Sequence, residues 1–264
     1  MRTKTVSKTD GERAEVMALK TAQLHFCVLG SSPLIMNRMS EKARQELLLP
    51  AAKKNQAERA ASLKHDPIAE FRGAIYRTQG DNHPTRVVMP GNAFGQALAS
   101  AAIDIPGAVK AQITRLTEVT DINVNVYGLP RLFMAVVRQS DINRTPDIRT
   151  RAIFPEWAVQ LGIRYVRDLL TEKTVINLLA ASGILIGIGD NRRAKGGVYG
   201  KFEIVEPDNK AFQTLIKNAG RKAQDEAIAQ AIPFDHDSEE LFGWFVNTAR
   251  DREKKITRGE LKVA

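Results

Sequence analysis

Residues 181–205 read Ala181-Ser182-Gly183-Ile184-Leu185-Ile186-Gly187-Ile188-Gly189-Asp190-Asn191-Arg192-Arg193-Ala194-Lys195-Gly196-Gly197-Val198-Tyr199-Gly200-Lys201-Phe202-Glu203-Ile204-Val205. This segment predicts the end of an apolar helix, a turn rich in glycine and cations, and then a strand. Thr171 is a suitable N-cap for the helix. The glycines of the turn permit positive φ angles and a close approach of the backbone to another group. The cations between them favour an anionic ligand.

Two familiar phosphate-binding motifs do not fit this turn. A Walker loop requires Gly-Lys-Ser/Thr, which does not follow these glycines. A Rossmann fingerprint requires a preceding strand, whereas here a helix precedes Gly187-Ile188-Gly189. A solvated turn whose glycines only satisfy backbone geometry is one alternative. Three cations within four residues, beside Tyr199, favour the backbone of a nucleic acid or a polyphosphate.

The composition also favours an anionic partner. The 264 residues carry a formal net charge of +9 with a pI near 9.7, which suits nucleic acid. With 43% apolar residues, the chain has enough apolar side chains for a sizeable core. Cys27 is the single cysteine, so the chain has neither an internal disulfide nor a cysteine-based zinc site. Because no apolar run reaches the length of a membrane span, we expect a soluble, cytoplasmic protein.

The first half of the chain predicts a tail, a strand and an inserted helical region. Residues 1–18 are mostly polar and charged, and residues 19–29 alternate as a strand does. A helical insertion is expected at about 40–76, with a short helix that starts at Asp66-Pro67. A short strand at 86–89 then leads through Pro90-Gly91-Asn92 into a helix of small residues at 93–103, whose N-terminus is suited to binding a phosphate.

The second half predicts several strands and two final helices. Alternation predicts strands at 113–119, 122–127, 132–137 and 157–166, and amphipathic helices at about 208–230 and 237–253. Residues 138–153 predict a basic loop or the end of a hairpin, with Arg144, Arg149 and Arg151 among its cations.

The order of these elements resembles the RAMP superfamily. Residues 186–202 resemble its C-terminal glycine-rich loop, and residues 88–94 are similar to the Pro-Gly-Ser-Ser-Leu turn of its backbone family. The resemblance implies an α+β fold with an RRM-like (ferredoxin-like) βαββαβ core at 19–206. It leaves a flexible tail at 1–18 and a C-terminal helical extension at 207–264.

The resemblance is closest to the subunit that repeats along the guide RNA in CRISPR effector complexes of the Cascade type. It implies a non-catalytic protein that binds single-stranded RNA, contacts copies of itself and other effector subunits, and needs no cofactor or metal. Cations beside glycines, in place of a base-reading set, predict little base preference. The chain departs from the family at Gly95 and Gln96, where a lysine and a glycine are common. Residues 30–40 contain no carboxylate, so metal-dependent RNA cleavage is not supported.

Two other functions remain open from the sequence. An RNA-processing endoribonuclease of the same superfamily would use a histidine as general acid or base, and His25, His65, His83 and His236 are available. None of them has a recognisable partner in the sequence. A phage or plasmid protein that coats single-stranded DNA would use the same kinds of contact.

The expected nucleic-acid contacts fall into three groups. The main group is the glycine-rich loop, the second is the turn before the small helix, and the third is a set of separate arginines. They are Gly187, Gly189, Asn191, Arg192, Arg193, Lys195, Gly196, Gly197 and Tyr199; Pro90, Gly91 and Asn92; and Arg38, Arg144, Arg149 and Arg151.

Overall fold

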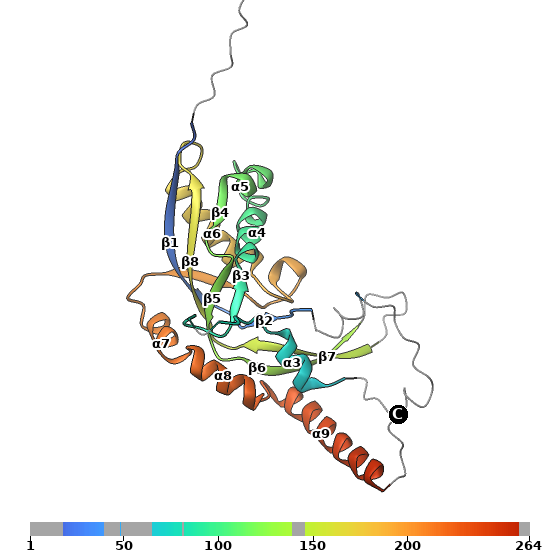
Figure 1. Ribbon diagram of the computed structural model, residues 1–264. Helices are drawn as coiled ribbons and strands as arrows, with labels where there is room; N and C mark the ends of the chain where they lie inside the picture. Colours follow the sequence, from blue (N-terminus) through green and yellow to red (C-terminus); the bar gives the residue numbers. More distant parts are fainter. Residues whose placement is uncertain (1–17, 40–47, 49–64, 81, 139–145, 259–264) are drawn as a thin grey trace, which may run out of the picture.

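The computed structural model describes residues 18–39, 48, 65–80, 82–138 and 146–258. The expected tail, most of the expected insertion before residue 65, and Arg144 lie outside the described residues. Figure 1 shows one sheet with helices beside it, a second sheet next to it, and the C-terminal helices below both. The chain therefore has a mixed α+β fold with antiparallel sheets, which confirms the expected class.

The larger sheet is built around two long central strands. Its described strands are β1 (Thr21–Gly30), β3 (Val88–Pro90), β4 (Thr117–Val119), β5 (Asn123–Tyr127), β8 (Ala158–Val166) and β9 (Phe202–Val205). They lie in the order β3-β5-β8-β1-β9, and β4 also pairs with β8. The register of β1 and β8 runs from Thr21 opposite Val166 to Leu29 opposite Ala158. All of the pairings are antiparallel.

Helices α4 (Gly91–Ala101) and α6 (Glu172–Ala181) pack against each other and share the core with this sheet. Phe94 of α4 contacts Phe202 of β9, with ring centroids 6.1 Å apart in an edge-to-face arrangement. Small side chains such as Ala97 are buried on α4, which allows close packing. The Thr171 hydroxyl accepts a hydrogen bond from the Thr174 N–H at 3.2 Å, so the predicted cap of α6 is confirmed.

The smaller sheet has the order β2-β7-β6, with β2 (Leu34–Met36), β7 (Pro146–Phe154) and β6 (Arg131–Arg138). Helix α3 (Pro67–Ala74) begins at the predicted start Asp66-Pro67, where Asp66 is the N-cap, and its Phe71 is fully buried. The expected loop at 138–153 is partly wrong, because residues 146–153 belong to β7. Buried residues 152–154 and a continuous ladder with β6 explain why this arginine-rich segment is a strand.

Three described helices follow the larger sheet: α7 (Lys210–Asn218), α8 (Arg221–Gln230) and α9 (His236–Thr257). The single helix expected at 208–230 is therefore two helices. The chain leaves helical geometry at Ala219, and Gly220 is the N-cap of α8. Below the larger sheet, α7 and α8 follow one another in Figure 1, and α9 continues past the smaller sheet.

One expected strand is partly helical. Residues 113–119 were expected to be a strand, but α5 (Lys110–Leu116) precedes the short β4. Ile113 is the buried residue of α5, and the Thr117 hydroxyl donates to its carbonyl at 2.8 Å. The apolar residues Ile113 and Leu116 are three positions apart, a spacing that suits one face of a helix as well as a short strand.

Candidate nucleic-acid interface

The glycine-rich loop begins with a π-helical turn, η1 (Ser182–Ile186), which continues directly from α6. Two backbone hydrogen bonds then close the base of the loop. Ile188 N–H donates to the Gly200 carbonyl at 2.9 Å, and Gly200 N–H donates to the Pro33 carbonyl at 2.8 Å. Gly200 has φ +70°, and a Cβ atom there would lie 1.8 Å from the Ile188 oxygen. This position therefore requires glycine.

The tip of the loop has regular local structure and exposes two of its three cations to solvent. The backbones of Arg192 and Tyr199 form an isolated β-bridge, and a single 3₁₀ turn, η2 (Arg193–Lys195), lies between these two residues. The side chains of Arg193 and Lys195 are exposed. Arg192 is half-buried, and its guanidinium donates to the Gly189 carbonyl at 3.1 Å, so this arginine also holds the loop together. The remaining predicted positions of the tip are Asn191, with φ 49°, and Gly196 and Gly197.

Tyr199 packs on the smaller sheet. Its ring centroid lies 6.3 Å from that of Phe133 on β6, and Phe133 in turn contacts Phe234 at 6.1 Å. The tyrosine is half-buried. Its ring therefore contributes to holding the tip of the loop against β6.

Asp190 fastens the loop to both β2 and β7. Its N–H donates to the Ile35 carbonyl at 2.9 Å, and its carboxylate accepts a hydrogen bond from the Asn37 amide at 3.0 Å. Arg151 Nε lies 3.0 Å from the same carboxylate oxygen, although the N–H does not point directly at it. The Arg151 side chain is only 13% exposed, so its charge is engaged within the protein.

The other predicted arginines do not join the loop. Arg149 is exposed on β7, two residues before Arg151. Arg38 is half-buried after β2, and its N–H donates to the Ala74 carbonyl at 3.0 Å. Arg144 lies outside the described residues.

The second predicted motif is the start of α4. Pro90 ends β3 and is the N-cap residue, and no side chain caps the helix. Gly91 N–H donates to the Ile122 carbonyl at 2.8 Å, and a Cβ atom on Gly91 would lie 2.0 Å from the Asp121 oxygen. Glycine therefore lets the helix start directly against the β4–β5 connection. Asn92, the next residue, is exposed.

The two motifs, about 100 residues apart in sequence, meet across a cleft of about 720 Å³ between α4 and the loop. We call this space the α4–loop cleft. Cations line it from two directions, with Lys110 from α5 and Arg192 and Lys195 from the loop. Asp104 is the carboxylate among its lining residues. Asn92 contributes the start of α4. The cleft is thus open, mainly cationic and adjacent to an uncapped helix N-terminus.

A smaller pocket of about 260 Å³ adjoins this cleft and shares Asn92, Gly189 and Arg192 with it. We call it the inner pocket. Tyr76 and Asn37 also line the inner pocket, which otherwise includes buried methionines.

Sequence reasoning missed Lys110, Asn37, Tyr76 and Asp190. Lys110, Asn37 and Tyr76 belong to no recognisable local motif. They come from separate segments, and only the tertiary fold brings them to the cleft or the inner pocket. Asp190 had one signal, since it lies within the glycine-rich segment itself.

The described histidines lie elsewhere. His25 is exposed on β1, 3.3 Å from the amide nitrogen of Gln23, and His65 lies between Glu70 at 2.8 Å and Asp147 at 3.0 Å. His83 and His236 are exposed. None of the four lines the α4–loop cleft or the inner pocket. Among the described residues, no group of three or more His, Cys, Asp or Glu side chains is placed to hold a metal ion.

No protein-family model matches this chain, and no curated protein matches it. Within the described part of the chain, every helix is too short or too polar to cross a membrane.

Proposed function

We propose that this protein binds single-stranded RNA without cutting it, and that the phosphates of the strand lie in the α4–loop cleft. The observation that carries the proposal is the meeting of the two motifs at one cationic cleft. Each motif alone has a purely structural explanation. Their convergence with Lys110 and Lys195 on the same open space supports a shared anionic ligand.

Electrostatics favours a phosphate backbone in this cleft. Lys110, Arg192 and Lys195 oppose the single carboxylate of Asp104 among the lining residues. The first turn of α4 adds the positive end of a helix dipole and has no side-chain cap. The chain as a whole has a formal charge of +9. These features predict binding that depends strongly on salt, because each neutralised phosphate releases counterions.

The fold supports an RRM-like core as part of the same proposal. The succession β1–α4–β5–β8–α6–β9 follows the βαββαβ order, with additional elements inserted between its parts. RRM domains stack bases on aromatic side chains of the open sheet face. The exposed positions of that face on β1 and β8 here are occupied by residues such as Gln23, His25 and Arg164, and none of them is phenylalanine, tyrosine or tryptophan. For this reason the proposal assigns the strand to the cleft rather than to the sheet.

The resemblance to the RAMP superfamily suggests the complex in which the protein would bind RNA. The protein would be a backbone subunit of a CRISPR-type ribonucleoprotein, in tandem with copies of itself and beside other effector subunits along a guide RNA. A strand that passes through one cleft per subunit would be covered by successive copies. Stoichiometry should then rise in steps with the length of the RNA, as measured by native mass spectrometry. One protein per strand at every length would contradict tandem assembly.

Fluorescence anisotropy with labelled oligonucleotides tests the binding itself. Single-stranded RNA, single-stranded DNA of the same sequence and duplex RNA should be compared over a range of salt concentrations. The proposal predicts that single-stranded RNA binds most tightly. The comparison with DNA of the same sequence isolates the contribution of the 2′-hydroxyl, the group that distinguishes RNA from DNA. Equal or tighter binding of DNA would favour a DNA-coating protein, and binding confined to duplex would reject the proposal. Gel analysis of the same RNA, with and without Mg²⁺, tests for cleavage.

A further inference from the structure

We infer that the inner pocket holds one nucleobase of the bound strand and prefers a base that carries an exocyclic amino group. This inference rests on the proposed function, since it assumes that the phosphates lie in the adjoining α4–loop cleft. It adds a specificity site of defined chemistry to a protein whose sequence predicts little base preference.

The size and the lining of the inner pocket suit a base. Its volume of about 260 Å³ lies below the range of about 300–1,000 Å³ that is typical for larger ligands. Met36 and Met89, both almost fully buried, supply apolar surface. Tyr76 adds an aromatic ring, and it is half-buried at the junction between α3 and β3. An aromatic ring beside apolar surface is how proteins bind unpaired bases.

Asn37 and Asp190 give the pocket two neighbouring hydrogen-bond acceptors, and Arg192 is the cation among its lining residues. Asn37 donates its amide N–H to the Asp190 carboxylate at 3.0 Å. A carboxylate only accepts hydrogen bonds, so this contact fixes the orientation of the amide and leaves the Asn37 oxygen as an acceptor. Asp190 accepts from Asn37 and from the Asn191 N–H, pairs with Arg151, and is still one-third exposed. A carboxylate has about four acceptor sites, so one remains for a ligand.

At the Asn37–Asp190 end of the pocket these acceptors disfavour a phosphate and favour a donor, whereas Arg192 lies where the pocket meets the cleft. Phosphate oxygens would meet the carboxylate of Asp190, whereas the amino group of cytosine or adenine would donate to it or to Asn37. Uracil has an oxygen at the position where cytosine has its amino group. The pocket should therefore distinguish these two bases, which have almost the same shape.

The geometry also connects the pocket to the proposed path of the backbone. Asn92, Gly189 and Arg192 line both the inner pocket and the α4–loop cleft. A nucleotide with its phosphate near Arg192 would therefore have its base beside residues that line both spaces.

The test compares oligocytidine with oligouridine RNA of equal length and label. The wild type should bind the cytidine strand about tenfold more tightly, since one good base contact discriminates by roughly 5- to 150-fold and the pocket is partly open. The Asn37→Ala variant should lower this ratio, because one of the two acceptors is lost, and leave the salt dependence unchanged. Tyr76→Leu should weaken the binding of both strands by about tenfold, and Tyr76→Phe should restore it because the ring is kept.

The outcomes separate this inference from the proposed function. Equal affinity of the wild type for the two strands, with salt-dependent binding intact, would overturn the base pocket and leave the RNA-binding function standing. An undiminished cytidine preference in Asn37→Ala would also overturn the pocket, since the discrimination would then arise elsewhere. No binding of either strand would reject the function and the pocket together. Asn37 is exposed, so its variant stays informative even if Tyr76→Leu fails to fold.

Discussion

Gln224 should be one of the most sensitive positions for stability in the described part of the chain. This side chain lies on α8 and is completely buried. Its Oε1 accepts from the backbone N–H groups of Arg86 and Val87 at 2.8 and 2.9 Å. Its Nε2 donates to the carbonyls of Val126, Gly128 and Ala219 at 2.7, 3.1 and 3.0 Å. One glutamine thus joins α8 to the edge of the larger sheet.

The cost of Gln224→Ala follows from these contacts. The two N–H groups lose a buried acceptor, and such a loss costs about 1–3 kcal/mol for each group. Together they give about 2–6 kcal/mol, before any cost of the cavity left by the side chain. That is a large share of the roughly 5–15 kcal/mol that stabilises an ordinary domain.

Urea denaturation followed by circular dichroism measures this effect. Gln224→Ala should lower the midpoint strongly, and Lys222→Ala, an exposed change on the same helix, should shift the free energy by no more than about 0.5 kcal/mol. A loss below about 1 kcal/mol for Gln224→Ala, at an unchanged m-value, would refute this reasoning. An early transition limited to part of the helical signal would show instead that the C-terminal helices unfold separately from the rest.

Three further predictions follow from local geometry. Gly200→Ala should lower the free energy of unfolding by about 2 kcal/mol or more in the same assay, because φ is +70° and the added Cβ would meet the Ile188 oxygen; a neutral result would contradict the positive-φ geometry. Burial, and to a smaller extent the charge of Glu206, raises the pKa of the Cys27 thiol. Iodoacetamide should therefore label Cys27 more slowly in the folded protein than in the urea-unfolded chain. Glu206→Gln should speed the labelling of the folded protein. The hydrogen bond from Arg86 lowers the pKa of Asp225 below its usual value of 3.8. The ionised Asp225 therefore stabilises the folded protein fully above about pH 4, and this stabilisation is lost as the pH falls through the lower pKa of the folded state. Because Asp225 is 44% exposed, the Asp225→Asn variant should flatten the acid limb of the stability curve by less than about 1 kcal/mol, and an unchanged acid limb would argue against the ion pair.

The sequence predicted the elements whose signals are local. The cap at Thr171 and the helix start at Asp66-Pro67 each depend on a few neighbouring residues, and both are present. The alternation of residues 157–166 predicted β8 within one residue. The glycines of the loop marked positions of positive φ, including Gly187 and Gly200.

The sequence could not predict features that depend on distant contacts. Residues 113–116 fit a helix or a strand equally well, and packing of Ile113 into the core decided for the helix. Gln224 is an ordinary polar residue in sequence, and its role exists only because α8 lies against the edge of β3 and β5. The cleft was missed in part for the same reason, since Lys110 and Lys195 line one cleft only in the folded chain.

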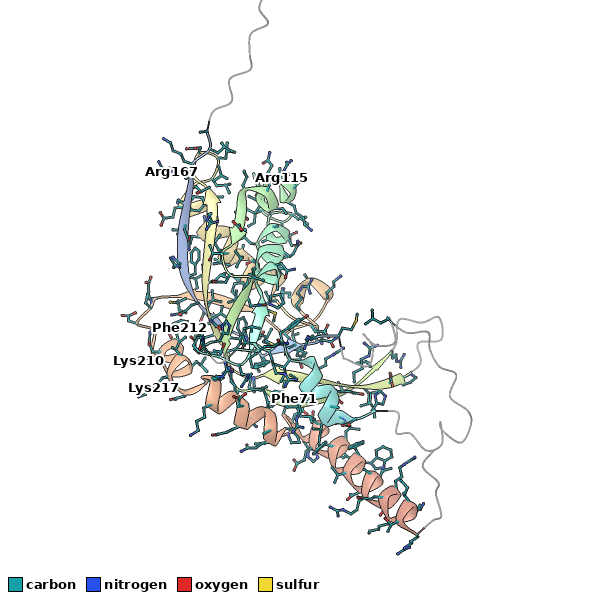
Figure 2. The ribbon with its side chains drawn as sticks, viewed as in Figure 1. Phe71, Arg115, Arg167, Lys210, Phe212 and Lys217 are labelled. Atoms are coloured by element: carbon teal, nitrogen blue, oxygen red, sulfur yellow. The ribbon has the colours of Figure 1, made fainter. Side chains whose placement is uncertain are left out.

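The salt dependence of RNA binding tests the α4–loop cleft most directly. A double variant, Lys110→Ala with Lys195→Ala, removes two exposed cations of the cleft. Lys210→Ala with Lys217→Ala is the matched control: both lysines are exposed on α7, and neither lines the cleft (Figure 2).

Each phosphate contact on a single strand contributes about −0.7 to the slope of log K against log salt concentration. The cleft variant should therefore lose about 1.4 from the steepness of the wild-type slope and bind more weakly at low salt, and the control should keep a slope close to that of the wild type. A cleft variant with the wild-type slope, or an equal loss in the control, would contradict the proposal that the strand lies in this cleft.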